Sequence, residues 1–515
     1  MYAGIPIWYI SLVLPVLVGI VALFASEKHG RAISWLSALT LIIPMIATAY
    51  YWAVNAVSNG VVDPWVLHLE KYGLGTFYLF MDGLSAPIVV GVSLVTAFVA
   101  VYAYKYMATR IEEMREEGEN PPGLGRFFFL YNVFAVAMLG MGLSSNLLEF
   151  YFFLEISLIS SFLLIAYYGY GDRKKIALLY FIWAHIAGAL FIAGSLVYGH
   201  YAHSLDVVRI VSGKVTYVSP ADELLGSAAR IVAGVMLLGL FIKMAVLGVH
   251  MWLPYAHAEA PTPVSALLSP NLIGLAGYAI VRFVLPLFPA ELKSIHGYLI
   301  LLAVSTIIYG GLVALRQTDF KRFLAYSSVS QMGYLLLGIA TLTAYGIGGA
   351  ILHYLTHAIG KAVLFMVAGV FITEEHGLRD MTRMGGLAKY YPFTAAAALL
   401  GFMHLVGMPP TLGMWSELLI TIGVVKAYPA VNTGNVILVA TMLLLAYGVS
   451  AGYAFITMRK VFYGRPREGY KHEVLDGFKT TVVILAVLGV LLFLGIAPLM
   501  APLKTASQQI ISLLG

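Results

Sequence analysis

The chain contains no cysteine and little charge. Of its 515 residues, 11% are charged and 60% are hydrophobic, whereas roughly a quarter of an average soluble domain is charged. A water-soluble enzyme of this length is therefore excluded. Because there is no thiol, structural disulfides, thiol-attached haem and cysteine-ligated iron–sulfur clusters are excluded as well.

Long apolar runs take the place of the missing charge. They come in blocks of about 20 residues, the length that one bilayer-spanning helix requires, and short polar segments separate them. The pattern predicts an all-α polytopic membrane protein with about 14 transmembrane helices. The expected spans lie near residues 7–25, 32–54, 77–104, 127–145, 147–168, 176–198, 230–250, 262–286, 295–315, 325–344, 347–372, 391–420, 434–458 and 479–500. The first run lacks a basic leading segment and a small-residue cleavage site, so it is interpreted as a retained helix.

The basic residues favour one side of the membrane. The chain has 31 Lys and Arg against 25 Asp and Glu. Roughly two thirds of the basic residues, Lys321 among them, are assigned to the odd-numbered loops, whereas Arg282 is assigned to an even-numbered loop. Loops with an excess of basic residues remain cytoplasmic. We therefore expect a cell-membrane protein with both termini outside. No Lys/Arg-rich segment with interleaved aromatics occurs, so no nucleic-acid partner is expected.

Several ionisable residues lie within the expected spans of the first half. A charged side chain at mid-bilayer costs about 2.5–3.5 kcal/mol on insertion scales, so it usually has a function. Glu155 lies well inside its span, whereas Glu149 lies near the start of the same helix, where an interfacial role competes with a functional one. Lys243 has no acidic neighbour in sequence and needs a carboxylate from another helix. The alternative is a buried ion pair without transport. His250 follows seven residues later, close to a helix break expected near Gly248–Pro254.

The second half contains a stripe of three titratable residues. His353, His357 and Lys361 recur at every fourth position, which places them on one helix face over about 12 Å. This spacing predicts a proton path, because His titrates near neutral pH. A haem site would normally place its axial His residues on facing helices, so the stripe fits a haem poorly.

A further carboxylate follows a second expected helix break. Residues 407–413 contain two prolines within an apolar run, and Glu417 comes shortly after them. Unwound backbone at membrane depth is tolerated where it is buried in protein or lines a watery cavity. Glu417 is thus predicted to lie beside such a segment, and His404, just before it, is a further candidate for the same path.

A repeated arrangement of helices is also predicted. Residues 127–286 and 287–462 are each expected to supply five helices, with ionisable residues and one broken helix. An odd number of helices makes the second unit enter from the opposite face, so the two units are predicted to be inverted repeats. Residues 1–126 would add helices 1–3, and residues 463–515 would add helix 14.

Six segments carry a resemblance to a known family, over about residues 75–425. They are Met81–Ser85, the Phe-rich run ending at Glu155, His250–Leu268, Asp319–Tyr334, the stripe His353–Lys361, and Trp415–Glu417. Together they resemble the antiporter-like, proton-translocating subunits of respiratory complex I, of Mrp-type cation/proton antiporters and of membrane-bound hydrogenases. The resemblance implies 14 core helices.

The resemblance also implies roles for particular residues. In the family's first half, Glu155 and Lys243 match a switchable ion pair. In its second half, His353, His357 and Lys361 match a proton path and Glu417 matches the exit group.

Two positions depart from the family pattern. Ser269 and Gly274 stand where relatives often carry Lys or His, which leaves Asn271 or water to link the two halves. Tyr255 stands where an Asp is usual.

We therefore expect an ion-translocating subunit of a membrane-bound redox complex, with no cofactor, no metal and no catalytic chemistry of its own. Its expected partners are H⁺, with Na⁺ as the alternative coupling ion, the lipid bilayer, and other antiporter-like and hydrogenase or dehydrogenase subunits. A subunit of a dedicated Mrp-type Na⁺/H⁺ antiporter is the main alternative, because it would share every motif. The sequence also leaves open a stand-alone transporter for a small solute and a quinone- or haem-binding membrane enzyme.

Overall fold

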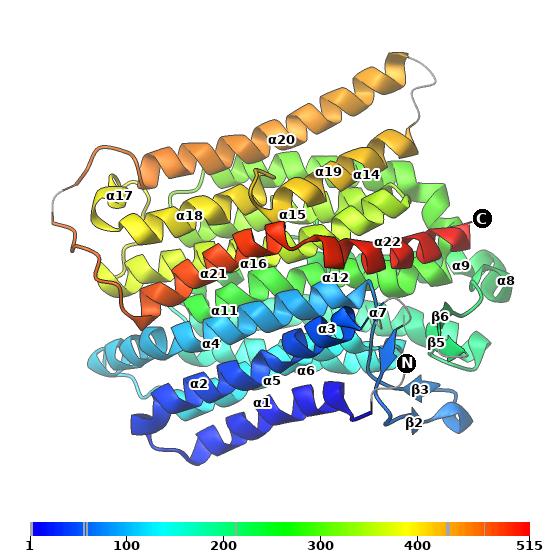
Figure 1. Cartoon of the computed structure of the whole chain (residues 1–515), viewed down its shortest axis with the longest axis horizontal. Coiled ribbons are helices and arrows are strands. Elements are labelled where there is room, and N and C mark those ends of the chain that lie inside the picture. Colours follow the sequence, from blue (N-terminus) through cyan, green and yellow to red (C-terminus); the bar gives the residue numbers. More distant parts are fainter. Residues whose placement is uncertain are drawn as a thin grey trace.

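The computed structural model describes residues 4–54, 57, 60–211, 214–428, 433–467 and 469–514. Its helices lie side by side along one direction (Figure 1). Among the described residues, 13 helices are long and apolar enough to cross a membrane. The remaining expected span, 391–420, consists of two shorter helices. The chain is thus an integral, multi-pass membrane protein, as predicted.

The first three spans differ in detail from the prediction. They are α1 (Ile7–Phe24), the pair α2 (Gly30–Leu41) and α3 (Ile43–Ala53), and α4 (Ser85–Glu116). The third span begins later than expected, because Thr76–Phe77 and Phe80–Met81 form strands and Asp82 Oδ1 accepts the backbone N–H groups of Leu84 and Ser85. It also ends later, and runs through much of the expected cytoplasmic loop.

The next five spans include two π-helical segments and one helix break. The regular helices are α5 (Leu124–Leu143), α6 (Leu147–Tyr168), α7 (Arg173–Ala202), α9 (Ala229–Met244) and α10 (Trp252–Glu259). The eighth span combines α11 (Thr262–Leu267), α12 (Ile273–Ala279) and α13 (Leu285–Leu287) through the π-helical segments η5 (Leu268–Leu272) and η6 (Ile280–Val284). The expected break after Lys243 is present, since α9 ends at Met244 and the next residue, Ala245, has a left-handed φ of 58°.

The second set of spans is more regular until its fourth member. It comprises α14 (Pro289–Leu315), α15 (Phe320–Ala340), α16 (Ala344–Glu374), the broken pair α18 (Pro392–Leu405) and α19 (Leu412–Ala427), and α20 (Thr433–Val461), with the short α17 (Leu387–Tyr390) before the pair. The last span, expected over 479–500, is instead α21 (Gly477–Leu494). A separate helix, α22 (Ala497–Ile511), follows it, with Pro498 in its first turn.

Six short strands and the short helix α8 (Asp222–Leu225) accompany the helical bundle. They pair as three antiparallel hairpins: β1 (Val61–Val62) with β4 (Phe80–Met81), β2 (Leu67–His68) with β3 (Thr76–Phe77), and β5 (Val208–Val211) with β6 (Lys214–Tyr217). The strands labelled in Figure 1 and both chain termini lie at the same end of the bundle, on the right. An even number of crossings therefore separates the termini.

The middle of the bundle is formed by α16 and the helices around it. This helix packs against α4, α15, α18, α19 and α21, and its residues from Gly346 to Ile372 are buried. The outer helices α1, α7 and α20 bury only part of their surface. The ionisable residues of α16 therefore lie in the interior, where each needs a polar neighbour.

Candidate functional site

The Glu155 carboxylate lies between helices α6 and α7. Its Oε2 atom is 3.2 Å from Nδ1 of His185 on α7. A glycine makes this approach possible, because a Cβ on Gly188 would lie 2.3 Å from Glu155 Oε1. His185 is one of the ionisable residues inside the expected span 176–198, but nothing in the sequence predicted that its ring would face Glu155, so it was not assigned to the path.

Lys243 is buried at the end of α9. Its Nζ atom has no hydrogen-bond partner in the described part of the chain, and it lies 5.9 Å from the centre of the Tyr180 ring. Glu155 attracts it electrostatically, but the two do not form an ion pair in this structure. Glu155 contacts His185 instead.

Glu149 contributes to the start of α6. Its Oε2 accepts the backbone N–H of Ser145 at 3.0 Å, and the neighbouring Asn146 side chain accepts the N–H of Leu148. A carboxylate in the first turn also interacts favourably with the helix dipole. These contacts give Glu149 a structural role at the start of α6, which the sequence did not predict.

Two histidines lie between Lys243 and the second half. The His250 ring is 5.0 Å from the Tyr309 ring, and the buried His257 ring is 5.2 Å from Phe365. Neither ring nitrogen of either residue has a hydrogen-bond partner among the described residues. His257 lies within electrostatic range of Lys361. It was not singled out in the sequence, although it lies only seven residues after His250.

The predicted stripe on α16 is fully buried. Lys361 Nζ donates to the Leu324 carbonyl at 2.8 Å and to the Ser327 hydroxyl, both on α15. His353 Nδ1 lies 3.3 Å from the Ser416 hydroxyl on α19. His357, between them, has no partner for either ring nitrogen within the described chain. The stripe thus reaches from α15 at one end to the broken helix at the other.

Asn271 connects the eighth span to α16. Its Oδ1 accepts a long hydrogen bond of 3.4 Å from the Tyr354 hydroxyl. Its Nδ2 has no partner among the described residues. Because Asn271 lies in η5, the π-helical turn brings a polar group to the same helix that carries the stripe.

The break between α18 and α19 places Glu417 and His404. The Glu417 carboxylate lies against Gly407, where a Cβ would be 2.2 Å from Oε2 and φ is +64°. The Glu417 Oε1 atom has no partner in the described structure. Nδ1 of His404 lies 2.8 Å from the Thr356 hydroxyl on α16. Gln331 Nε2 donates to the Leu405 carbonyl at 2.9 Å, which satisfies backbone that the break leaves unpaired.

Two basic residues assigned to loops in the orientation count are buried instead. Lys321 lies inside α15 and donates to the Ala260 carbonyl. Arg282 lies in η6, and its guanidinium contacts the two Asp82 carboxylate oxygens at 2.5 and 2.8 Å. The loop assignment of both residues was therefore wrong. Arg282 could have been recognised, because it lies inside the expected span 262–286.

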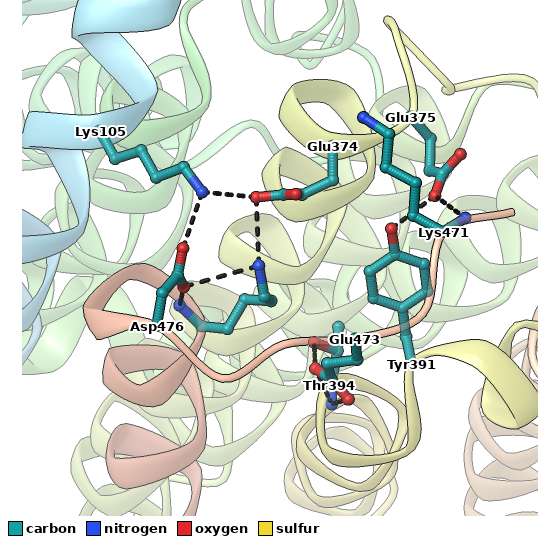
Figure 2. A network of polar contacts seen from close by, with 9 residues as sticks. Lys105, Glu374, Glu375, Tyr391, Thr394, Lys471, Glu473 and Asp476 are labelled. Carbon is teal, nitrogen blue, oxygen red and sulfur yellow. Dashed lines mark hydrogen bonds and ion pairs between the residues drawn. The ribbon is translucent and has the colours of Figure 1, made fainter.

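A cluster of charges holds the far end of α16, away from the termini. Lys105 Nζ donates to Glu374 at 2.6 Å and to Asp476 at 2.7 Å, and Lys479 Nζ donates to Glu374 at 3.1 Å (Figure 2). Although burial opposes the charge, the hydrogen bond from Lys105 lowers the pKa of the Asp476 carboxyl. Glu473 accepts the N–H groups of Phe393 and Thr394 at the start of α18. The cluster thus joins α4, α16 and α21.

Among the described residues, no set of three His, Asp or Glu side chains converges on a point that could hold a metal ion. What the site does contain is a series of buried bases and acids with hydroxyl groups beside several of them. Such groups can accept and release protons in turn.

These features define a class: a polytopic membrane protein with a row of titratable side chains through its interior. The comparisons with known proteins agree. Residues 144–444 match the family described as NADH:quinone oxidoreductase/Mrp antiporter, transmembrane, and the chain belongs to this family.

Individual relatives match over nearly the whole chain. Subunit M of the NADH-quinone oxidoreductase of Rickettsia prowazekii is 29% identical over 494 residues, which cover 92% of this chain and 93% of the relative. A chain of respiratory complex I from Thermus thermophilus has a TM-score of 0.81 at 25% identity, with 99% of this chain and 100% of that chain covered. A chain of the Mrp complex from Dietzia sp. has a TM-score of 0.79 at 21% identity, with 99% of each chain covered.

Proposed function

We propose that this chain translocates protons as an antiporter-like subunit of a membrane-bound redox complex. The observation that carries the proposal is the row of titratable residues, all of them buried except the half-buried Glu155. It begins at Glu155 and Lys243, continues through His250 and His257, and reaches the α16 stripe and Glu417. Such residues are costly inside a membrane and mark ion pathways. The name of the Rickettsia relative supports a redox complex.

Each residue of the path has a distinct role in this proposal. Glu155 and Lys243 hold and release the proton in the first half. The members of the second half are His353, His357, Lys361 and Glu417, with His404 beside the break. Asn271 helps to link the halves, because it contacts α16 from the eighth span. Glu149 fixes the start of α6 and lies outside the proposed path.

We further propose that residues 127–286 and 287–462 are inverted repeats. Each range contains five spans, and the fourth span of each is broken: α9 and α10 in the first range, α18 and α19 in the second. This arrangement would place one half-channel on each side of the membrane. Residues 1–126 and 463–515 flank the repeats.

In this proposal the end of the bundle that carries the termini faces outside. The excess of basic residues at the opposite end supports this orientation. The chain has no native cysteine, so single cysteines at the exposed positions Ser26 and Ser512 test it directly. A membrane-impermeant thiol reagent added to intact cells should label Ser512→Cys and not Ser26→Cys. The reverse pattern would overturn the orientation.

The function is tested on the complex purified in mild detergent. We expect the unmodified protein (the parent) to co-purify with redox subunits and to give redox-driven acidification of proteoliposomes. We expect Lys243→Ala and Lys361→Ala to lose this acidification. Acidification that persists in both variants would contradict the proposed path. Co-purification of antiporter subunits alone, with Na⁺-driven proton exchange, would favour the Mrp-type alternative, for which the fold of the Dietzia chain is equally suitable.

A further inference from the structure

One titratable residue of the first half lies on the outside of the bundle. The His185 side chain is 53% exposed, whereas that of Glu155 is 19% exposed. The His185 ring is stacked on Phe181, with a centroid separation of 5.7 Å and an interplanar angle of 5°. This stacking holds Nδ1 toward Glu155 and leaves the remainder of the ring at the surface.

The surface around His185 is apolar. Leu178, Ile182 and Ile186 are exposed beside it on α7, and Phe152 and Ile159 are exposed on the adjoining α6. His185 lies near the middle of a 30-residue helix, far from both membrane interfaces. An imidazole beside a carboxylate at this depth is unfavourable in lipid, and such residues normally face protein or a watery cavity. Another membrane protein segment is therefore expected to cover this face.

The inner side of Glu155 faces a different base. Lys243 attracts the carboxylate electrostatically from α9 and has no hydrogen-bond partner of its own among the described residues. The other groups near Glu155 are the hydroxyls of Tyr151 on α6 and Tyr180 on α7. Glu155 thus lies between an imidazole at the surface and an amine in the interior.

We propose that His185 relays protons between Glu155 and a titratable side chain of a neighbouring membrane subunit that docks on the α6–α7 face. Nε2 of the neutral ring first takes a proton from the partner's acid, and the resulting imidazolium then releases its Nδ1 proton to the Glu155 carboxylate. Exchange of the ring between its two tautomers restores the Nδ1–H before the next cycle. One proton thus crosses the subunit boundary in each cycle, and His185 regains its starting charge. The relay rests on the proposed proton translocation, and names the route by which the first half exchanges protons with its partner.

The relay is tested in the assembled complex with His185→Gln. The Gln amide can still donate a hydrogen bond to Glu155 but cannot carry a proton. We expect acidification to fall several-fold, as in Glu155→Gln, because the relayed proton passes through that carboxylate, while assembly is unchanged. His200→Gln is the matched control, since His200 lies at the other end of α7 and its ring contacts Tyr201.

A second variant separates relay from structural support. In His185→Ala, added imidazole should restore acidification, because a free base can replace the missing ring. A loss that imidazole does not restore would assign His185 a structural role and overturn the relay. Parent-level acidification in His185→Gln, with acidification reduced in Glu155→Gln, would also overturn it but leave the proposed function standing. If Glu155→Gln is active as well, the proposed function itself fails in the first half.

The docking partner is tested by cross-linking. Cysteine placed at Ile182, in a chain without native cysteine, carries a photoreactive group in the purified complex. The expected product joins Ile182 to a transmembrane segment of another subunit that contains an ionisable residue. Cross-links to lipid alone would show that the α6–α7 face borders the bilayer, and would overturn the proposed docking.

Discussion

The two halves of the molecule hold their titratable residues in different ways. In the first half, Glu155 contacts a base on the exposed face of the bundle, and Lys243 is buried without a hydrogen bond to any described residue. In the second half, Lys361 donates to two oxygens on α15 and His353 approaches a hydroxyl on α19, all in the interior. The first half is thus open toward the side of the bundle, whereas the second is closed around α16.

This difference indicates a division of labour. A pair at the surface can exchange protons with a neighbouring subunit. A row surrounded by hydroxyl groups is better suited to transfer within the chain, because hydrogen-bonded groups orient one another. The two helix breaks also differ in how closely a side chain satisfies their backbone: the hydrogen bond is 2.9 Å at the second break and longer at the first. Gln331 satisfies the carbonyl of Leu405 at the second break, whereas Thr306 on α14 accepts the N–H of Leu247 at the first, at 3.3 Å.

The largest effect is expected from Lys361→Arg in the closed half. Arginine keeps the charge but does not release its proton at physiological pH, so acidification should fall by about tenfold or more. Lys361→Ala should abolish acidification to a similar degree but fold less well, because the Leu324 carbonyl and Ser327 hydroxyl lose their donor. Lys426→Arg, an exposed position on α19, is the control. Parent-level acidification in Lys361→Arg would show that only the charge is needed.

A smaller loss of acidification is expected when the carboxylate of either half is replaced by an amide. Glu155→Gln and Glu417→Gln should each reduce acidification of proteoliposomes several-fold, by about 1 kcal/mol of activation free energy or more. The double variant should be no worse than the more severe single variant if protons pass through both halves in series. Additive losses would indicate two independent paths, and would break the comparison made above.

The second helix break should contribute measurably to stability. Gln331→Leu leaves the Leu405 carbonyl and the Tyr453 hydroxyl without this donor, and a buried unsatisfied group costs about 1–3 kcal/mol. Thermal unfolding in detergent should therefore occur several degrees lower. Thr306→Val at the first break should have the weaker effect, because its bond is longer. Equal shifts would remove this distinction between the breaks.

The smallest effects are expected from two carboxyls at opposite ends of the bundle. Burial raises the pKa of the Asp63 carboxyl to about 6 from its ordinary 3.8. Between these values the folded chain holds a proton that the unfolded chain has released, so stability falls as pH rises. Asp63→Asn should remove this decline.

Asp476 should show the opposite dependence. Its pKa lies below the ordinary value, so its stabilising contribution is present above that ordinary value and is lost as the pH falls toward the lower one. Asp476→Asn should therefore destabilise the protein at neutral pH and have little effect in acid. Unfolding temperatures measured across pH for both variants test the two signs. Parallel pH profiles would contradict the assigned shifts.

The sequence alone determined most of the membrane architecture. Apolar runs of the required length placed 13 spans that the structure contains as long helices, and the breaks followed from Pro and Gly near Lys243 and in residues 407–413. The stripe on α16 was also predictable, since a helical period of 3.6 residues fixes which positions share a face. These features depend on the spacing of residues along the chain, which can be read directly from the sequence.

Contacts between distant segments depended on the tertiary structure. The pairing of Glu155 with His185 requires α6 and α7 to meet at Gly188. Arg282 reaches Asp82 across 200 residues, and Lys321 is buried because α10 and α15 pack together. Apolar faces specify that helices associate, but neighbour choice and rotation depend on how all side chains fit at once. Which titratable residues contact one another is therefore determined only by the packing of the folded bundle.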